Sequence, residues 1–188
     1  MKKIILASAS PRRKELLEQI GLEFEIITSD QEEHYQNTIP EEIVKELALM
    51  KAEHVASEIG AKDLLVIGAD TIVVLDGEIL GKPEDEEDAF SMLNRLRGRV
   101  HQVFTGVALL DYDRKGKKEI RNFSVETKVY VCEMQKQEIW DYVRTGEPMD
   151  KAGAYGIQGK FAAFINRIEG DYYNVVGLPI SKIYQEIK

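Results

Sequence analysis

The sequence predicts an α/β protein. Short strand-like runs alternate with amphipathic helical segments through most of the 188 residues, and no repeat, low-complexity tract or linker interrupts them. The run Leu64–Ala69 is apolar at every position, which is typical of a central strand covered on both faces. A chain of this length buries a large core, so we expect one compact domain or two lobes that share a core.

The first third of the chain contains clear helix signals. Ser10 is a favourable N-cap, Pro11 suits the first helical position, and Gly21 follows the expected last turn. Gly60 closes a second, longer helix in the same way. The elements expected here are a strand at Ile4–Ala7, a helix at Pro11–Ile20, a strand at Phe24–Thr28, a polar loop at Ser29–Ile39, a helix at Pro40–Ile59 and the strand Leu64–Ala69, which stops at Asp70.

Turn signals organise the remainder of the chain. Asp76 and Gly77 supply the positive φ angles of a tight hairpin turn, and the charged segment Lys115–Lys118 separates two long strands. We expect a hairpin of Thr71–Leu75 and Glu78–Leu80, a helix at Asp85–Leu96, a hairpin of Val103–Asp111 and Ile120–Val131, a helix at Gln135–Thr145, a Gly-rich loop at Gly153–Gly159, a strand near Phe161–Ile168 and a helix from Pro179.

Composition excludes several classes of function. The chain has 25 Lys and Arg against 33 Asp and Glu, and this formal net charge of -8 disfavours a sequence-independent nucleic-acid binder. Cys132 is the only cysteine, which excludes an internal disulfide and a Cys-based zinc site. No apolar stretch approaches the length of a membrane span. We therefore expect a cytoplasmic protein in a reducing compartment.

Four cationic residues are candidate ligands for an anion. Arg12 and Arg13 lie in the first turn of a helix, where the backbone dipole disfavours each cation by about 0.3–1 kcal/mol. An anion bound at the free N–H groups would make the two cations stabilising instead. The alternative interpretation is that both arginines are simply solvated. Lys51 falls within the apolar arc of its helix, so its amine either meets an anionic partner or reaches solvent. Lys82 follows the hairpin and alone is an ordinary turn lysine.

Candidate carboxylates accompany these cations. Asp70 and Ser8 each follow an expected strand, at the edge where α/β sheets bind ligands, although an Asp there is equally typical of a turn. Glu33 lies in a polar loop, where a solvated charge is the simplest interpretation. The glycines of Gly153–Gly159 indicate either a flexible loop or close backbone approach to a ligand.

The combination of these groups suits a polyphosphate with a divalent ion and a carboxylate that activates water. The sequence contains neither a Walker A motif nor a Gly-x-Gly-x-x-Gly motif. The residues by themselves therefore indicate a phosphate-handling α/β protein and leave the reaction open.

Three motifs carry a family resemblance. Ser8–Leu17 reads Ser-Ala-Ser-Pro-Arg-Arg-Lys-Glu-Leu-Leu, Gly68–Thr71 reads Gly-Ala-Asp-Thr, and Tyr155–Gly159 reads Tyr-Gly-Ile-Gln-Gly. In this order, and along the whole chain, they resemble the Maf family of nucleoside triphosphate pyrophosphatases. The resemblance implies a single domain over residues 1–188, with an elongated mixed β-sheet, flanking helices and two lobes around a cleft, like the inosine triphosphate pyrophosphatases.

The resemblance also implies a reaction, which is hydrolysis between the α and β phosphates of a nucleoside triphosphate with a divalent metal, Mg²⁺, Mn²⁺ or Co²⁺. Asp70 is the implied proton acceptor, and Glu33 and Asp70 are the implied metal ligands. The implied phosphate ligands are Ser8, Arg12, Arg13, Lys51 and Lys82.

Three further positions resemble the family branch that acts on dTTP and UTP: Arg12, Thr71 and Gln158. The branch that acts on 7-methyl-GTP typically has an aromatic residue in place of Arg12 and an acidic residue in place of Gln158. The amide of Gln158 offers both a donor and an acceptor to a pyrimidine edge.

The implied role is removal of surplus or non-standard nucleotides, modified pyrimidines included, with an association to cell division arrest and septum formation. One alternative is a nucleotide sensor without turnover, which has no need of Asp70 as a base. A purine-specific enzyme on the same fold is disfavoured by Thr71 and Gln158. The preferred metal and the oligomeric state, a homodimer included, stay open.

Overall fold

The computed structural model describes residues 2–188 and confirms the α/β class. Within these residues, seven strands form one mixed sheet in the order β2-β1-β3-β5-β6-β7, with β4 paired to β3. The strands are β1 (Lys3–Ala7), β2 (Glu25–Ile26), β3 (Leu64–Leu75), β4 (Glu78–Leu80), β5 (Val100–Tyr112), β6 (Lys118–Val131) and β7 (Ile165–Glu169). The helices are α1 (Pro11–Gln19), α2 (Pro40–Glu58), α3 (Glu86–Leu96), α4 (Lys136–Val143), α5 (Tyr172–Val176) and α6 (Ile180–Ile187). Short 3₁₀ segments are η1 (Glu147–Asp150), η2 (Ala152–Ala154) and η3 (Lys160–Phe164). None of the helices in residues 2–188 combines the length and apolarity that crossing a membrane requires.

The expectation that a strand stops at Asp70 is wrong. β3 continues through Asp70 to Leu75 because the β-branched residues that follow also favour extended backbone. What changes near Asp70 is the pairing partner. β3 pairs in parallel with β1, from Lys3 with Leu64 to Ala7 with Gly68, and then pairs antiparallel with β4 across the Asp76–Gly77 turn. Asp70 therefore lies inside a continuous strand, between two pairing segments.

Other differences are smaller. β2 is shorter than expected: it is an edge strand with two exposed residues, which pair with Ile5 and Leu6 of β1. Phe161 belongs to η3 and not to the last strand, since its buried ring packs among other aromatic rings. α5 was not expected, because five residues are too few to show helical periodicity.

The chain divides into two compact units, and β3, β5 and β6 contribute residues to both. The first unit contains the residues up to Asp70, Thr105–Val125 and Gly177–Lys188. The second contains Thr71–Phe104 and Glu126–Val176.

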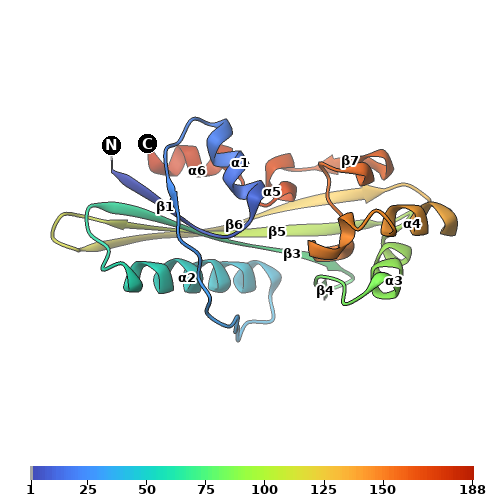
Figure 1. The fold of residues 1–188 in the computed structure, drawn as a ribbon, viewed down its shortest axis with the longest axis horizontal. Coiled ribbons are helices and arrows are strands. Elements are labelled where there is room, and N and C mark those ends of the chain that lie inside the picture. The colour runs from blue at the N-terminus through green and yellow to red at the C-terminus, as the bar shows by residue number, and fades with distance from the viewer. Residues whose placement is uncertain (1) are drawn as a thin grey trace. The chain divides into compact units, whose positions relative to one another are not determined.

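The first unit is organised around α2. This helix lies along one face of the strands, and α1 and α6 lie on the other (Figure 1). Its apolar face packs into a core with residues of β1, β3 and β5. Two sheet glycines permit close contact: a Cβ on Gly68 would lie 2.2 Å from the carbonyl oxygen of Ala48, and a Cβ on Gly106 would lie 2.1 Å from that of Val44. The backbone of α2 is thus seated directly on β3 and β5.

The second unit packs α3 against α4. The ring of Phe90 stacks on that of Trp140, with centroids 4.6 Å apart. α3 begins at Glu86, one residue after the expected start, and Asp85 is its N-cap, whose carboxylate accepts the backbone N–H of Asp88 at 2.8 Å. A second aromatic group joins Tyr142, Tyr155 and Phe161. Tyr155 and Phe161, on either side of the Gly-rich segment 156–159, are thus packed through Phe161 against Tyr142 of α4.

Candidate functional site

Lys51 and Asp70 form a largely buried ion pair between α2 and β3. The Lys51 ammonium donates to Oδ1 of Asp70 at 2.6 Å. Asp70 is 8% exposed, and the side chain of Lys51 is 17% exposed. The lysine in the apolar arc of α2 therefore has the anionic partner that its position calls for, and the solvated alternative does not hold.

Glu33 approaches the same ammonium from the loop before α2. Its Oε1 lies 2.7 Å from Nζ of Lys51, while its side chain remains 54% exposed. The interpretation of Glu33 as a solvated charge is thus incomplete, because one ammonium bridges two carboxylates. Two carboxylates that converge on one cation are also a donor set that suits a hard divalent ion such as Mg²⁺.

Burial raises the pKa of Asp70 above its ordinary value, and the neighbouring cations Lys51 and Arg13 oppose that shift. A carboxylate with a raised pKa is a stronger base than a solvated aspartate. Such a group, next to a cation, fits the pattern of a functional carboxylate.

Ser8 and Arg13 lie beside this pair because of the sheet register. β1 and β3 run parallel with Ala7 opposite Gly68, so Ser8, which follows the end of β1, lies near the level of Asp70 inside β3. Arg13 donates through Nη1 to Oγ of Ser8 at 3.0 Å and through Nε to the carbonyl oxygen of Gly177 at 2.8 Å. Burial lowers the pKa of Arg13, which still remains a cation at physiological pH.

The first turn of α1 carries two cations and no acidic residue of its own. Ser10 occupies the N-cap position but its side chain accepts no capping hydrogen bond, and the first turn has no acidic residue. The backbone N–H of Ser10 instead donates to Oγ of Ser8 at 3.3 Å. Arg12 and Arg13, both half-buried, occupy this turn, which is therefore electropositive.

The remaining predicted residues belong to the second unit. Thr71 follows Asp70 in β3 and is half-buried, and both Lys82 and Gln158 are exposed. The Gly-rich loop meets the turn before Lys82, since the N–H of Gly153 donates to the carbonyl oxygen of Gly81 at 3.0 Å.

Sequence reasoning missed one group of metal-ligating types. Ligand atoms of Asp30, His54 and Glu58 all lie within 4.8 Å of one another, and Nδ1 of His54 is 3.0 Å from Oγ of Ser29. The helical spacing of His54 and Glu58 was readable from the sequence, but the position of Asp30 was not, because the loop before α2 has no periodic pattern.

Comparisons with known proteins agree with this fold. Residues 3–188 match a family described as "Maf-like protein". The dTTP/UTP pyrophosphatase of Lachnoclostridium phytofermentans is 49% identical over 188 residues, which cover 100% of this chain and 95% of that protein. The dTTP/UTP pyrophosphatase of Alkaliphilus oremlandii is 53% identical over 184 residues, covering 97% of this chain and 93% of that protein. A HAM1 protein from Coxiella burnetii has a similar fold, with a TM-score of 0.51 and 16% identity over 99% of this chain and 100% of that chain.

Proposed function

This chain belongs to the Maf family, and from that premise we propose that it hydrolyses dTTP and UTP to the monophosphate and pyrophosphate. Two relatives similar over nearly their full length bear the name dTTP/UTP pyrophosphatase. The observation that carries the proposal is the buried carboxylate of Asp70 beside the ammonium of Lys51.

Asp70 is the proposed general base. Its carboxylate would accept a proton from a water molecule as the water oxygen attacks the α phosphorus. The bond between the α phosphorus and the bridging oxygen would then break, and pyrophosphate would leave. The raised pKa of Asp70 supports this role, because it brings the basicity of the carboxylate nearer to neutral pH.

Lys51 would change partners during the reaction. In the resting site its ammonium bonds to Asp70 and Glu33, and a bound phosphate would compete for the same donors. Release of Asp70 from Lys51 would free an oxygen lone pair for the water. The proposed phosphate ligands are Ser8, Arg12, Arg13, Lys51 and Lys82, and the electropositive first turn of α1 supports the assignment of the first three.

Thr71, Gln158 and Arg12 are the proposed specificity residues. An amide presents both a donor and an acceptor, as the edge of uracil or thymine does. A carboxylate in place of Gln158 would only accept hydrogen bonds and would face the carbonyl oxygens of the pyrimidine.

A divalent ion, Mg²⁺, Mn²⁺ or Co²⁺, is the proposed cofactor, held by Glu33 and Asp70. The fit rests on the two carboxylates that already converge on one cation centre. When bound, such an ion would neutralise phosphate charge and polarise the scissile anhydride. The group of Asp30, His54 and Glu58 is a second candidate position, but its aspartate side chain is almost fully exposed.

Other parts of the proposal rest on composition and family. The family match over residues 3–188 supports one functional domain. The single cysteine suits a reducing compartment such as the cytoplasm, and the acidic net charge disfavours nucleic acid as a partner. The house-cleaning role towards modified pyrimidines and the link to cell division stay predictions.

The test is a screen of nucleoside triphosphates with Mg²⁺ or Mn²⁺ that detects monophosphate and pyrophosphate separately. We expect dTTP and UTP to be the preferred substrates. Asp70→Asn should still bind nucleotide but lose about 10²–10⁴-fold in turnover, the usual effect of removing a general base. The control is Asp141→Asn, which alters an exposed ion pair on α4. Nucleotide binding without pyrophosphate release in the unaltered protein would identify a sensor, and near-normal turnover in Asp70→Asn would remove that residue from the mechanism.

A further inference from the structure

Gln158 lies on a segment with firm anchors on both sides. It is exposed, whereas its neighbour Ile157 and the nearby Phe161 are buried. Before it, the hydroxyl of Tyr155 lies 2.7 Å from Nε2 of His101, and both side chains are buried. An exposed residue between such anchors has a defined position only if the backbone that carries it is held.

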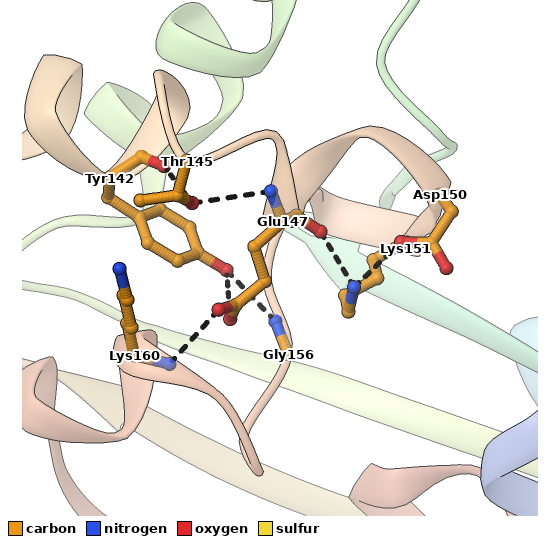
Figure 2. A network of polar contacts seen from close by, with 7 residues as sticks. All are labelled: Tyr142, Thr145, Glu147, Asp150, Lys151, Gly156 and Lys160. Atoms are coloured by element: carbon orange, nitrogen blue, oxygen red, sulfur yellow. Dashed lines mark hydrogen bonds and ion pairs between the residues drawn. The ribbon is translucent and has the colours of Figure 1, made fainter.

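Glu147 supplies that hold through its carboxylate (Figure 2). Its Oε1 accepts the hydroxyl of Tyr142 at 2.9 Å, and its Oε2 accepts the backbone N–H of Lys160 at 3.2 Å. The same hydroxyl of Tyr142 accepts the N–H of Gly156 at 3.3 Å. The network therefore hydrogen-bonds to the backbone N–H groups two residues before Gln158 and two residues after it.

Both oxygens of the Glu147 carboxylate act as acceptors in this network. Both contacts of the Glu147 carboxylate are donors, so the group must accept on each oxygen. Burial raises the pKa of Tyr142, which keeps its hydroxyl protonated and able to donate. The ammonium of Lys151 bonds instead to the backbone carbonyl of Glu147 and to Asp150, each at 2.6 Å. Figure 2 shows this separate contact beside the carboxylate.

The backbone also approaches Glu147 more closely than a side chain would permit. A Cβ on Gly159 would lie 2.0 Å from Oε1 of Glu147. The glycine after Gln158 is thus explained by direct contact with this carboxylate, and not by flexibility.

We infer that Glu147 is a positioning residue for substrate specificity, which acts through Tyr142 and the backbone of residues 156–160 to place the amide of Gln158 against the pyrimidine edge. The inference rests on the proposed function and deepens it, because it names a residue outside the family motifs on which recognition of the base depends.

The experiment measures kcat/KM for dTTP and GTP in the unaltered protein and in Glu147→Gln, Gln158→Ala and the double variant. Glutamine keeps the shape of Glu147 but presents an amide donor to one of the two donors. We expect the ratio of dTTP to GTP to fall about tenfold in Glu147→Gln, as for loss of one hydrogen bond to the base. In the Gln158→Ala background the same substitution should leave the ratio unchanged, because Glu147 acts through Gln158. Asp150→Asn, which alters the neighbouring contact of Lys151 and leaves the Glu147 carboxylate in place, should keep the normal ratio.

A second readout does not depend on activity. Amide hydrogen exchange at residues 156–160 should be faster in Glu147→Gln than in Asp150→Asn. Equal exchange, or equal losses for dTTP and GTP, would overturn the inference. A normal ratio in Gln158→Ala would overturn base reading by Gln158 and the inference with it. No hydrolysis of any triphosphate by the unaltered protein would instead refute the proposed function and leave hydrogen exchange to decide the role of Glu147.

Discussion

Replacement of Lys51 by methionine tests the electrostatics of the site most directly. The substitution keeps the apolar stem but removes the ammonium 2.6 Å from Asp70. Two unit charges about 4 Å apart attract by about 4 kcal/mol at an effective dielectric constant of 20, and removal of one partner of a buried pair costs about 3–5 kcal/mol. Arg13 remains as a nearby cation, so the lower end of that range applies. The contact with Glu33 adds little, since that side chain is mostly exposed.

We therefore expect Lys51→Met to lower the free energy of unfolding by about 3 kcal/mol at neutral pH, with a decrease in Tm of about 6–12 °C for a protein of this size. The effect depends on pH with a definite sign. Without Lys51 the folded-state pKa of Asp70, already raised by burial, rises further. Because protonated Asp70 needs no cation, the stability difference is fully present above that pKa and decreases as pH falls through it.

Urea unfolding at neutral and at mildly acidic pH measures both effects. The matched control is Lys45→Met on the same helix, which breaks the partly exposed pair of Lys45 with Glu42 and should cost less than about 1 kcal/mol. If Lys51→Met is no more destabilising than the control, or is equally destabilising at both pH values, the account of the ion pair is wrong.

Two further predictions concern the metal and the helix seat. Glu33→Gln should raise the Mg²⁺ or Mn²⁺ concentration needed for half-maximal hydrolysis about tenfold or more, because a carboxylate ligand is lost. His54→Gln should leave that concentration unchanged. The reverse result in a metal titration would move the metal site to Asp30, His54 and Glu58. Gly68→Ala should destabilise the protein by about 1–3 kcal/mol or more, since the added methyl group would lie 2.2 Å from the carbonyl oxygen of Ala48 and the backbone must shift. The control is Gly60→Ala, at a position with a positive φ but open space around a Cβ. Thermal unfolding of both variants separates the steric overlap at Gly68 from the ordinary cost of replacing a glycine. Equal decreases in Tm would contradict the steric explanation.

The parts of the fold that local rules determine were predictable. The bounds of α1, α2 and α3 agree with short-range patterns to within one residue, as do the Asp85 cap of α3, the Asp76–Gly77 turn and the buried strand at Leu64–Ala69. Ser10 has the expected N-cap position of α1 but makes no capping hydrogen bond. The continuation of β3 beyond Asp70 was not predictable in the same way, since it depends on β4 taking over as a pairing partner.

The residues of the candidate site differ in the same way: those that break a local pattern were predictable, and those placed by the folded chain were not. Lys51 could be identified because a charge on an apolar helix face violates a periodic pattern, and the pattern implied that a partner exists. Glu33 breaks no local rule, so only the folded loop shows that it reaches Lys51. Glu147 and Tyr142 gave no signal either, because besides contacting each other they bond to backbone N–H groups, which every sequence supplies.

The seating of α2 on Gly68 and Gly106 has a consequence for how mutational data on this protein should be interpreted. Neither glycine has any chemistry to offer a substrate, yet each leaves no room for a methyl group beside the helix that carries Lys51. A saturation screen scored by hydrolysis alone would rank both positions with Asp70 and Lys51. A parallel screen scored by abundance would show that the loss at the two glycines comes from depletion of the folded protein, whereas at Lys51 lost stability and lost chemistry would both contribute. Intolerance to substitution would thus report a lack of space at the two glycines, and chemistry together with stability at Lys51.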